Sequence, residues 1–389
     1  MTQRLTTARN ILDVGVRFFV LGCLSFGGPA AHLGYFRRAF VQRLGWLDDD
    51  GYARLVALAQ FLPGPASSQV GFAIGLQRAG LLGGLAAFIG FTLPSFVVMT
   101  ALAVGSQRWL DQAWLPGVID GLKWLALVVV ADAVIGLFLS FCRRALTQSI
   151  AIVTAATVLL SPWVWAQPLL LLLMALLGAR FLVADSIQLN PTTAGRLKFW
   201  PLMVFALLLL ALVLVRTDLT DLALSFFSAG SLVFGGGHVV LPLLQSSVGS
   251  AMDTDQFLFG YASAQAMPGP LFTIAAFLGA HLQPEQPWWG AAVATLAIFL
   301  PGFLLVLALA DIWRRLAARP RLAGALAGVN AAVVGLLLAA LYQPVFVSAI
   351  DGVTALALAL LGLVALRFLR CPVLVLVAVA IALGCLGWV

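Results

Sequence analysis

The sequence contains few charged residues. Asp, Glu, Lys and Arg make up 10% of its 389 residues, whereas 62% are hydrophobic. A soluble domain averages about 25% charged and about 45 to 50% apolar residues, so this composition excludes an ordinary soluble protein and places most of the chain in a lipid bilayer. The net charge of +7 does not indicate a nucleic-acid partner, because the basic residues are scattered through short loops and form no continuous stripe.

Histidine and cysteine are also scarce, with three and four residues respectively. The cysteines are isolated and include no CxxC pair, so they predict neither a disulfide, a redox centre nor a metal site. The histidines form no HExxH motif, and no nucleophile and base stand at a catalytic spacing. We therefore expect no metal and no other cofactor, and a membrane-embedded enzyme is only a distant alternative.

Long apolar runs are what the sequence does contain. A membrane-spanning helix needs about 17 to 25 residues. Runs of this kind occupy residues 80–104, 121–141, 163–184, 198–215, 288–311, 321–341, 345–366 and 372–388, with a shorter one at 147–161. Four further apolar stretches are interrupted by glycine and proline, at 11–45, 50–78, 219–250 and 255–282. We predict an all-α polytopic membrane protein with discontinuous helices, and about 9 membrane segments if the interrupted stretches re-enter or about 13 if they cross.

The interruptions occur twice in the same order. PheGlyGlyPro at 26–29 and ProGlyPro at 63–65 correspond to PheGlyGlyGly at 234–237 and ProGlyPro at 268–270. Corresponding positions stay 205 to 208 residues apart, which is too constant for chance. The sequence therefore predicts a first repeat at 1–184, a linker with an extra span at 185–218, and a second repeat at 219–389.

Loop charges predict the orientation of the spans. The positive-inside rule places the basic loops in the cytoplasm. These loops carry Arg143 and Arg144; Arg180, Arg196 and Lys198; Arg314, Arg315, Arg319 and Arg321; and Arg367 and Arg370. The spans at 80–104 and 288–311 then run in opposite directions, so the repeats have inverted topology. The N-terminus is expected in the cytoplasm and the C-terminus outside.

The first interrupted stretch can cross the membrane or re-enter from the side where it began. Re-entry would place Arg37, Arg38 and Arg43 in the cytoplasm, whereas crossing would place them outside, so charge mildly favours re-entry. The direction in which each later span crosses the membrane is the same in both cases. The choice between them stays open at this point.

Broken helices in opposed repeats predict a transport site. Unpaired backbone groups are costly in hydrocarbon, so breaks occur inside protein or beside wet cavities, and paired breaks near the midplane form the sites of many secondary transporters. Glycine amides can form an anion nest, and a helix that restarts after proline presents free N–H groups. We expect an anion to bind among Gly27, Gly28, Pro29, His32, Gln60, Pro63, Gly64, Pro65, Ser67, Ser68 and Gln69 of the first half. The second half contributes Gly235, Gly236, Gly237, His238, Gln265, Pro268, Gly269, Pro270 and Thr273.

Structural roles are the alternatives for several of these residues. Glycines in membrane helices most often allow close helix packing, although duplicated glycine motifs beside duplicated ProGlyPro motifs favour a site. Either His32 or His238 can donate to an oxyanion or cap a turn.

Three polar residues within the apolar spans are candidates for coupling. Asp132 lies mid-span, where a carboxylate is costly, and it either carries protons or accepts a structural hydrogen bond. Lys123 lies about 13.5 Å from Asp132 along a helix, too far for a direct pair. Lys123 either tunes the site or snorkels to an interface beside Asp120, which is the favoured alternative. Its counterpart in the second repeat is Asn330.

Taken together, the motifs resemble those of the chromate ion transporter family in its fused two-domain form. In the first half the resemblance rests on the segments 25–32, 45–47, 59–69 and 91–95, including SerPheGlyGlyProAlaAlaHis at 25–32. In the second half it rests on 233–238, 266–270, 300–301 and 328–335. The resemblance covers almost the whole chain, and it depends on the set of motifs because no single one would carry it.

The resemblance implies a bacterial inner-membrane transporter that exports chromate and confers chromate resistance, driven by membrane potential, a proton gradient or both. Chromate is a tetrahedral dianion with acceptor oxygens only, which donor groups such as amides and hydroxyls match. Sulfate has the same shape and is the expected competitor, so a sulfate or other oxyanion transporter is the alternative. The lipid bilayer is the other expected partner, and the sequence is compatible with a homodimer.

Overall fold

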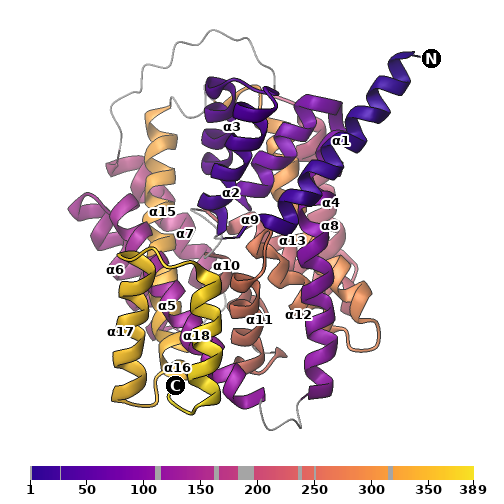
Figure 1. The fold of residues 1–389 in the computed structure, drawn as a ribbon. Helices are drawn as coiled ribbons and strands as arrows, with labels where there is room; N and C mark the ends of the chain where they lie inside the picture. Colours follow the sequence, from indigo (N-terminus) through magenta and orange to yellow (C-terminus); the bar gives the residue numbers. More distant parts are fainter. Residues whose placement is uncertain are drawn as a thin grey trace. The chain divides into compact units, whose positions relative to one another are not determined.

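The computed structural model describes residues 2–26, 28–109, 115–161, 166–182, 197–234, 239–248, 251–313 and 319–389. The described residues form helices and connecting turns without a β-strand (Figure 1). The chain divides into two compact units. Unit 1 comprises Met1–Leu110, Trp200–Gly237 and Ser263–Leu307, and unit 2 comprises Asp111–Phe199, His238–Ala262 and Ala308–Val389. Each unit contains segments of both sequence halves. The units therefore do not coincide with the two repeats, and the repeat boundaries given above stay a prediction from the sequence.

Unit 1 contains both interrupted stretches of the first half and most of their counterparts in the second half. Its helices are α1 (Thr2–Leu24), α2 (Gly28–Phe36), the π-helix η1 (Arg37–Arg43), α3 (Asp49–Phe61), α4 (Ala66–Trp109), α8 (Phe199–Leu214), α9 (Asp218–Leu232), the short turn η4 (Leu271–Thr273), α12 (Ile274–Leu282) and α13 (Pro287–Leu309). Helices end where glycine and proline were expected to break them: α1 ends at Leu24, before the first glycine motif, and α3 ends at Phe61, before the first ProGlyPro.

Unit 2 contains uninterrupted apolar helices and the two helices that precede the second ProGlyPro. They are α5 (Leu115–Phe141), α6 (Ala145–Leu160), α7 (Ala166–Phe181), α10 (Val240–Val248), α11 (Thr254–Ala266), α15 (Pro320–Ala340), η5 (Leu341–Phe346), α16 (Val347–Ala349), α17 (Val353–Arg367) and α18 (Val373–Cys385). Helices α17 and α18 form a pair beside α5 (Figure 1).

Four helical segments are long and apolar enough to cross a membrane: Ala66–Ser106, Pro116–Phe141, Pro287–Leu309 and Pro320–Ala349. Six shorter apolar helices accompany them, so the prediction of an all-α polytopic membrane protein is confirmed. The span predicted at 345–366 is wrong at its start. Residues 345–349 belong to η5 and α16, which follow α15 directly, and α17 begins only at Val353, because the exposed Asp351 and Gly352 form a turn before it.

Helix α4 is a hairpin of a short arm (66–78) and a long arm (81–109). Ala79 and Gly80 have non-helical dihedral angles, and Gly80 has a φ of +67°, a conformation that glycine adopts without the penalty of a side chain. The arms touch so closely that a Cβ atom on Gly75 would overlap the carbonyl oxygen of Gly83. In the second half, α12 and α13 make the same close contact through Gly279 and Gly290.

Contacts along α4 show that α1 and α2 run in opposite directions. On the long arm, Gly15 of α1 lies against Ala86, and a Cβ on Gly22 would be 2.6 Å from the Phe91 carbonyl oxygen, so α1 runs parallel to this arm. Helix α2 runs parallel to the short arm, because its His32 contacts Ser67 and its Phe36 lies against Gly71. Since the two arms are antiparallel, the chain leaves the first break toward the side from which it came.

Helix α3 repeats this arrangement at the first ProGlyPro. Its first turn is held at the far end of α2, where Arg37 and Asp49 form an ion pair of 2.7 Å. Its last turn meets the start of α4 at the break. Helix α3 is therefore antiparallel to the short arm. Of the two alternatives, crossing and re-entry, both breaks of the first half have the re-entrant form.

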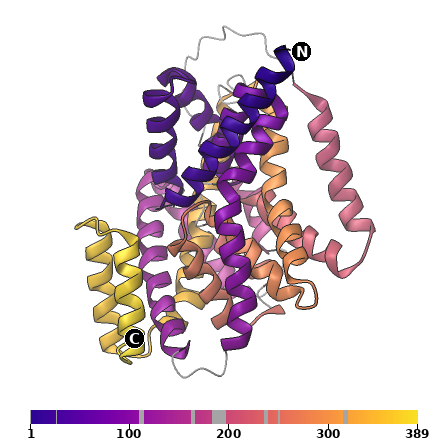
Figure 2. The ribbon, with the colours of Figure 1, turned by 45° about the vertical axis from the view of Figure 1, so that its right-hand side comes forward.

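Aromatic residues from both sequence halves fill the core of unit 1. The rings of Phe72 and Phe303 stack with centroids 4.5 Å apart, and Phe88 lies 5.1 Å from Phe299. These contacts join the α4 hairpin to α13. Helices α8 and α9 form a second hairpin, drawn in pink in Figure 2, with Phe205 against Phe227 at 5.0 Å.

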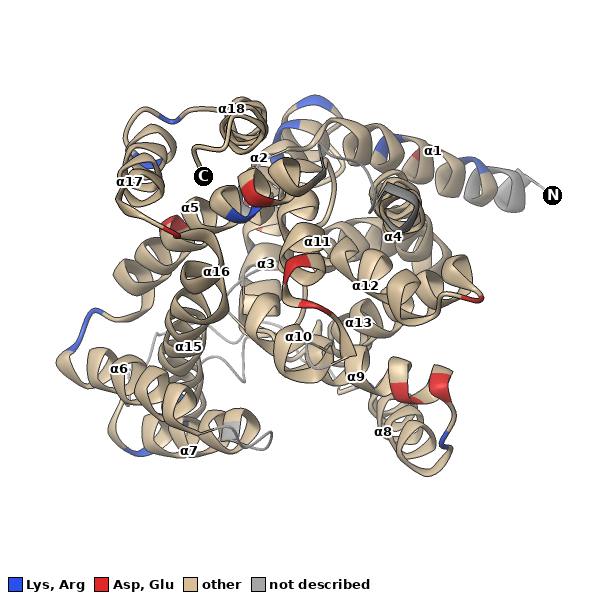
Figure 3. Ribbon diagram, turned by 90° about the horizontal axis from the view of Figure 1, so that it is seen from below, with Lys and Arg blue, Asp and Glu red and all other residues tan. Residues whose placement is uncertain are grey.

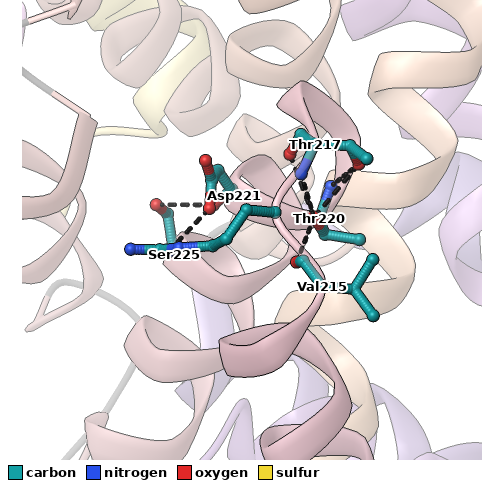
Figure 4. A network of polar contacts seen from close by, with 6 residues as sticks. Val215, Thr217, Thr220, Asp221 and Ser225 are labelled. Atoms are coloured by element: carbon teal, nitrogen blue, oxygen red, sulfur yellow. Dashed lines mark hydrogen bonds and ion pairs between the residues drawn. The ribbon is translucent and has the colours of Figure 1, made fainter.

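The turn from α8 into α9 is closed by side-chain hydrogen bonds (Figure 4). The Thr217 hydroxyl accepts from the backbone N–H of Thr220, and the Thr220 hydroxyl donates to the Val215 carbonyl at 2.7 Å. The Asp221 carboxylate forms an ion pair of 2.8 Å with the Arg216 guanidinium, and the Ser225 hydroxyl donates to the Asp221 backbone carbonyl. Such caps satisfy backbone donors at a helix start that have no partner within the helix, and they fix the beginning of the helix that leads to the second glycine motif.

Unit 2 is packed through small residues. A Cβ on Gly121 would overlap the Ala380 carbonyl oxygen, one on Gly178 the Gly324 oxygen, and one on Gly335 the Ala151 oxygen. Close backbone approach at small residues is the usual way in which membrane helices associate. Charged residues colour only a few short segments of the ribbon in Figure 3, and most of the ribbon is uncharged.

Candidate functional site

The two ProGlyPro breaks are each closed by the glycine motif of the other sequence half. The Gly64 N–H donates to the Val233 carbonyl at 2.7 Å, and the Gly269 N–H donates to the Ser25 carbonyl at 3.0 Å. Ser25 and Val233 occupy corresponding positions, directly before Phe26 and Phe234. The two bonds are therefore counterparts under the repeat, and they bring both breaks together within unit 1.

Both glycines at these bonds have backbone conformations that other residues rarely adopt. Gly64 has a φ of +123° and Gly269 a φ of +98°. A Cβ on Gly64 would lie 2.9 Å from the Gln69 amide nitrogen, and one on Gly269 would lie 2.8 Å from Ser95 Oγ. Both the conformation and the space require glycine here.

The prolines after these glycines stand one residue before the helices they introduce. The Pro65 carbonyl accepts from the Gln69 N–H at 2.9 Å, so Pro65 is the N-cap of α4. Pro270 is likewise the N-cap of η4. In both repeats the helix therefore begins at the residue directly after the proline. The N–H groups of Ala66, Ser67 and Ser68 occupy the first turn of α4, where helix geometry provides them with no partner.

A buried polar cluster surrounds the start of α4. Its members are Ser25, His32, Ser67, Ser68 and Gln69, each at most 3% exposed. His32 Nε2 lies 3.2 Å from the Ser25 carbonyl oxygen, which only accepts, so Nε2 carries the proton. His32 Nδ1 then accepts from the Ser67 hydroxyl at 3.3 Å. Both ring nitrogens of neutral His32 are engaged, and the ring positions Ser67 against the first glycine motif.

Gln69 spans the first break with its side-chain amide. Its nitrogen donates to the Pro63 carbonyl at 2.8 Å and to the Gly302 carbonyl at 3.3 Å. Because both partners are acceptors, the orientation of the amide is determined by its surroundings. Gln69 therefore holds the break closed, and its Oε1 atom is buried without a partner among the described residues.

Two hydroxyl groups of the cluster and one on the long arm of α4 have no partner in the described part of the chain. Ser25 Oγ, Ser68 Oγ and Thr92 Oγ1 are buried and lack a hydrogen bond within the described part of the chain. Buried polar groups are usually paired, so an unpaired group calls for an explanation such as an absent ion or water. These hydroxyls and the free amides of the α4 first turn are donors, which is the chemistry an oxyanion requires.

The corresponding region of the second half is more apolar. Leu271, Phe272 and Ile274 are at most 4% exposed, and Thr273 is fully buried. The Thr273 hydroxyl donates to the Pro270 carbonyl at 2.8 Å and is thereby satisfied within its own turn. The second break contributes backbone geometry, whereas most of the polar side chains belong to the first.

The remaining predicted residues are spread around this centre. Gly28 has a φ of +75° and Pro29 follows it in the first turn of α2; both are partly exposed. Gln60 is exposed on α3, away from the buried cluster, while Gln265, Pro63 and Pro268 are partly exposed. Gly27, Gly235, Gly236, Gly237 and His238 lie outside the described residues.

Unit 2 contains the three coupling candidates. Asp132 accepts from Arg367 at 2.7 Å, and both side chains are partly exposed. Lys123 contacts Asp120 at 3.1 Å and Asp255 at 2.8 Å with its side chain only 9% exposed. The amine thus lies between two half-exposed carboxylates, and one of them belongs to Asp120, the neighbour expected from the sequence. Asn330 lies partly exposed in α15.

Sequence reasoning missed several of these partners. Ser25, Thr92 and Ser95 were not recognised as part of the site, although Ser25 stands next to the first glycine motif and Thr92 and Ser95 flank Pro94 in an apolar helix. Arg367 and Asp255 were not identified as partners of Asp132 and Lys123. Among the described residues no group of three His, Cys, Asp or Glu side chains could hold a metal ion.

The chain is similar to known proteins over most of its length. The family model described as chromate transporter matches residues 12–179 and again 220–387. A probable chromate transport protein of Synechococcus elongatus is 30% identical over 334 residues, covering 82% of this chain and 80% of the relative. A chromate transport protein of Pseudomonas aeruginosa is 30% identical, covering 82% of this chain and 78% of the relative.

A chromate transport protein of Cupriavidus metallidurans is 27% identical over 399 residues, covering 95% of this chain and 92% of the relative. No solved structure matches the chain. The double match of the family model follows the repeat that contains the two breaks, and the match is to transporters, which agrees with the absence of a catalytic motif in the sequence. The chain belongs to the chromate transporter family.

Proposed function

We propose that this protein transports chromate, that it exports the anion from the cytoplasm across the bacterial inner membrane, and that it thereby confers chromate resistance. The N-terminus would lie in the cytoplasm and the C-terminus outside, as the loop charges predict. The anion would bind where the two breaks meet in unit 1. The observation that carries this location is the set of buried, unpaired donors beside the start of α4.

Chromate fits such a site because it offers acceptors and no donors. Within the described ranges, Ser25 Oγ and Ser68 Oγ are buried without hydrogen-bond partners, and the first-turn amides of α4 add donors at the positive end of a helix dipole. Each hydrogen bond to a charged group contributes about 1.5 to 3 kcal/mol. No carboxylate belongs to the cluster of Ser25, His32, Ser67, Ser68 and Gln69, so no like charge opposes the dianion there.

The membrane potential is sufficient to drive export. A potential that is negative inside contributes about 2.3 kcal/mol per charge per 100 mV, so roughly 4.6 kcal/mol for a dianion. Proton coupling through Asp132 is not required. Asp132 forms an ion pair with Arg367 at 2.7 Å, which supports a structural role for this carboxylate.

Sulfate is the alternative substrate, because it presents the same tetrahedral set of acceptor oxygens to the same donors. Neither the hydroxyls nor the backbone amides distinguish the two anions by chemistry. The two differ mainly in size, so a competition measurement has to rank them.

Everted membrane vesicles provide the test, because their exposed face is the cytoplasmic one. We expect saturable, protein-dependent chromate uptake that an uncoupler reduces, competition by excess sulfate, and loss of uptake when Ser25 and Ser68 are both changed to Ala. Absence of uptake in vesicles that contain the protein would overturn export. Full activity of the double serine variant would remove the buried cluster from the site while leaving chromate transport intact.

A further inference from the structure

A second cavity in unit 1 lies between α1 and the α2 and η1 segment. Its volume is about 710 Å³, and its polar lining consists of Asp13, Arg17, Tyr35, Arg38 and Arg43. Ligand cavities are typically about 300 to 1,000 Å³. None of these residues belongs to the candidate anion site, so the cavity is a separate feature.

The charge of this cavity is unbalanced. Asp13 is neutralised by Arg17, whose Nε lies 2.8 Å from its carboxylate. Arg38 lies over the Tyr35 ring at 4.9 Å, and no carboxylate pairs with Arg38 or Arg43 among the described residues. The neighbouring Arg37, which does not line the cavity, is paired with Asp49 at 2.7 Å. Two guanidinium groups therefore face the cavity without a counter-charge.

The other side of the cavity is apolar and continues onto the exposed surface of α1. Val16, Val20 and Leu24 line it and are 54%, 47% and 62% exposed. Leu12, one turn earlier, is 68% exposed. Positions four apart lie on one face of a helix, so these side chains form an apolar stripe that leads away from the arginines. In a membrane protein, such a stripe is exposed to acyl chains.

We propose that this cavity binds the phosphate headgroup of an anionic phospholipid, with its acyl chains along the stripe of α1. Guanidinium groups recognise phosphate with paired, charge-assisted hydrogen bonds, and basic pockets between membrane helices on the cytoplasmic side bind anionic headgroups. The re-entrant form of α1 and α2, together with the positive-inside rule, places Arg38 and Arg43 on that side. A free oxyanion would satisfy the arginines equally, but it would leave the apolar stripe unused.

The test is native mass spectrometry of the purified full-length protein titrated with phosphatidylglycerol, with phosphatidylcholine as the zwitterionic lipid and sulfate as the free oxyanion. We expect selective binding of phosphatidylglycerol. An arginine near an anionic lipid contributes about fivefold in affinity, so the double variant Arg38→Gln with Arg43→Gln should bind phosphatidylglycerol about 25-fold more weakly.

Two further variants separate loss of the site from loss of the fold. Arg38→Lys with Arg43→Lys retains both charges but not the paired hydrogen bonds, so its affinity should lie between those of the unchanged protein and the double glutamine variant. Arg37→Gln, next in the sequence but outside the cavity, should bind as the unchanged protein does. Equal binding of both lipids, undiminished binding by the double glutamine variant, or displacement of phosphatidylglycerol by sulfate would each overturn the proposal. The last result would assign the cavity to a free oxyanion.

Discussion

The two ProGlyPro breaks of unit 1 have the same backbone and different side chains. Gly64 and Gly269 both have positive φ angles and both donate to the residue before a glycine motif. Ser67, Ser68 and Gln69 follow the first break, whereas the corresponding positions after the second are Phe272, Thr273 and Ile274. The repeat has thus kept the geometry that brings the breaks together, while the positions that follow the first break are more polar than those that follow the second.

The same imbalance extends into the apolar spans of unit 2. Lys123 and Asp132 lie on α5, and their counterparts 207 residues later are Asn330 and Ala339 on α15. One half therefore supplies most of the polar chemistry, and the other supplies a matching framework. The comparison teaches that equal positions in a duplicated transporter need not carry equal roles.

The largest effects are expected at Gly64 and Gly269, the two glycines with the backbone conformation that both breaks share. Gly64→Ala and Gly269→Ala should each abolish chromate uptake, because a left-handed residue with a side chain costs about 1 to 2 kcal/mol and overpacking adds about 1 to 3 kcal/mol. Vesicle uptake and thermal unfolding of the purified protein would measure both effects. Gly34→Ala is the control, since Gly34 lies in α2 with nothing within 4 Å of an added Cβ. Normal uptake by either ProGlyPro variant would show that the two breaks are not equivalent.

Replacing Gln69, whose side-chain amide spans the first break, should reduce uptake and stability far more than replacing Ile274, its apolar counterpart at the second break. Gln69→Leu removes the donor to the Pro63 and Gly302 carbonyls, and each buried group left unpaired costs about 1 to 3 kcal/mol. We expect lost uptake and a lowered unfolding temperature. Ile274→Val should cost only about 0.5 to 1.5 kcal/mol and leave uptake intact. Similar losses in both variants would contradict a division of roles between the halves.

The hydroxyls of Ser68 and Thr273 give a sharper comparison, since they occupy corresponding positions. Ser68 Oγ is unpaired, whereas Thr273 Oγ1 donates to the Pro270 carbonyl. Ser68→Ala should raise KM for chromate about tenfold or more with little change in unfolding temperature, because a hydrogen bond to a charged group contributes about 1.5 to 3 kcal/mol. Thr273→Val should lower the free energy of unfolding by about 1 kcal/mol without changing KM. The reverse pattern would assign the anion to the second break.

The smallest effect is expected at Asp132. Asp132→Asn removes a partly exposed ion pair with Arg367, and pairs of this kind contribute about 0 to 1 kcal/mol. The pH profile of chromate uptake should superimpose on that of the unchanged protein, with Arg367→Gln as the matched variant. A shifted profile in Asp132→Asn alone would make the carboxylate a proton carrier after all.

The sequence predicted the places where helices break, because glycine and proline determine such places locally. It could not predict which carbonyl closes each break. Gly64 and Val233 are 169 residues apart, and Gln69 and Gly302 are 233 apart; a donor motif carries no information about its distant acceptor. Asp132 was recognised as unusual from its position alone, yet its partner Arg367 reads in sequence as an ordinary loop arginine.

Helix lengths were predicted less well than helix breaks. The apolar run at 163–184 contains a described helix of only 16 residues, and the one at 372–388 a helix of 13. Apolar composition indicates that a segment lies in lipid but does not specify where its backbone stays helical. Turn residues such as Asp351 and Gly352 decide where it does.

The reciprocal bonds between the halves also constrain how the protein is made. Gly64 emerges from the ribosome 169 residues before Val233, its acceptor. At about 5 to 20 residues per second, this interval lasts about 8 to 34 s. During that time the first half must be inserted into the bilayer while the Gly64 amide and the Ser25 carbonyl still lack their partners from the second half. Water or the insertion machinery has to provide hydrogen bonds to these two groups in the meantime. Completion of the first half therefore waits for translation of the second.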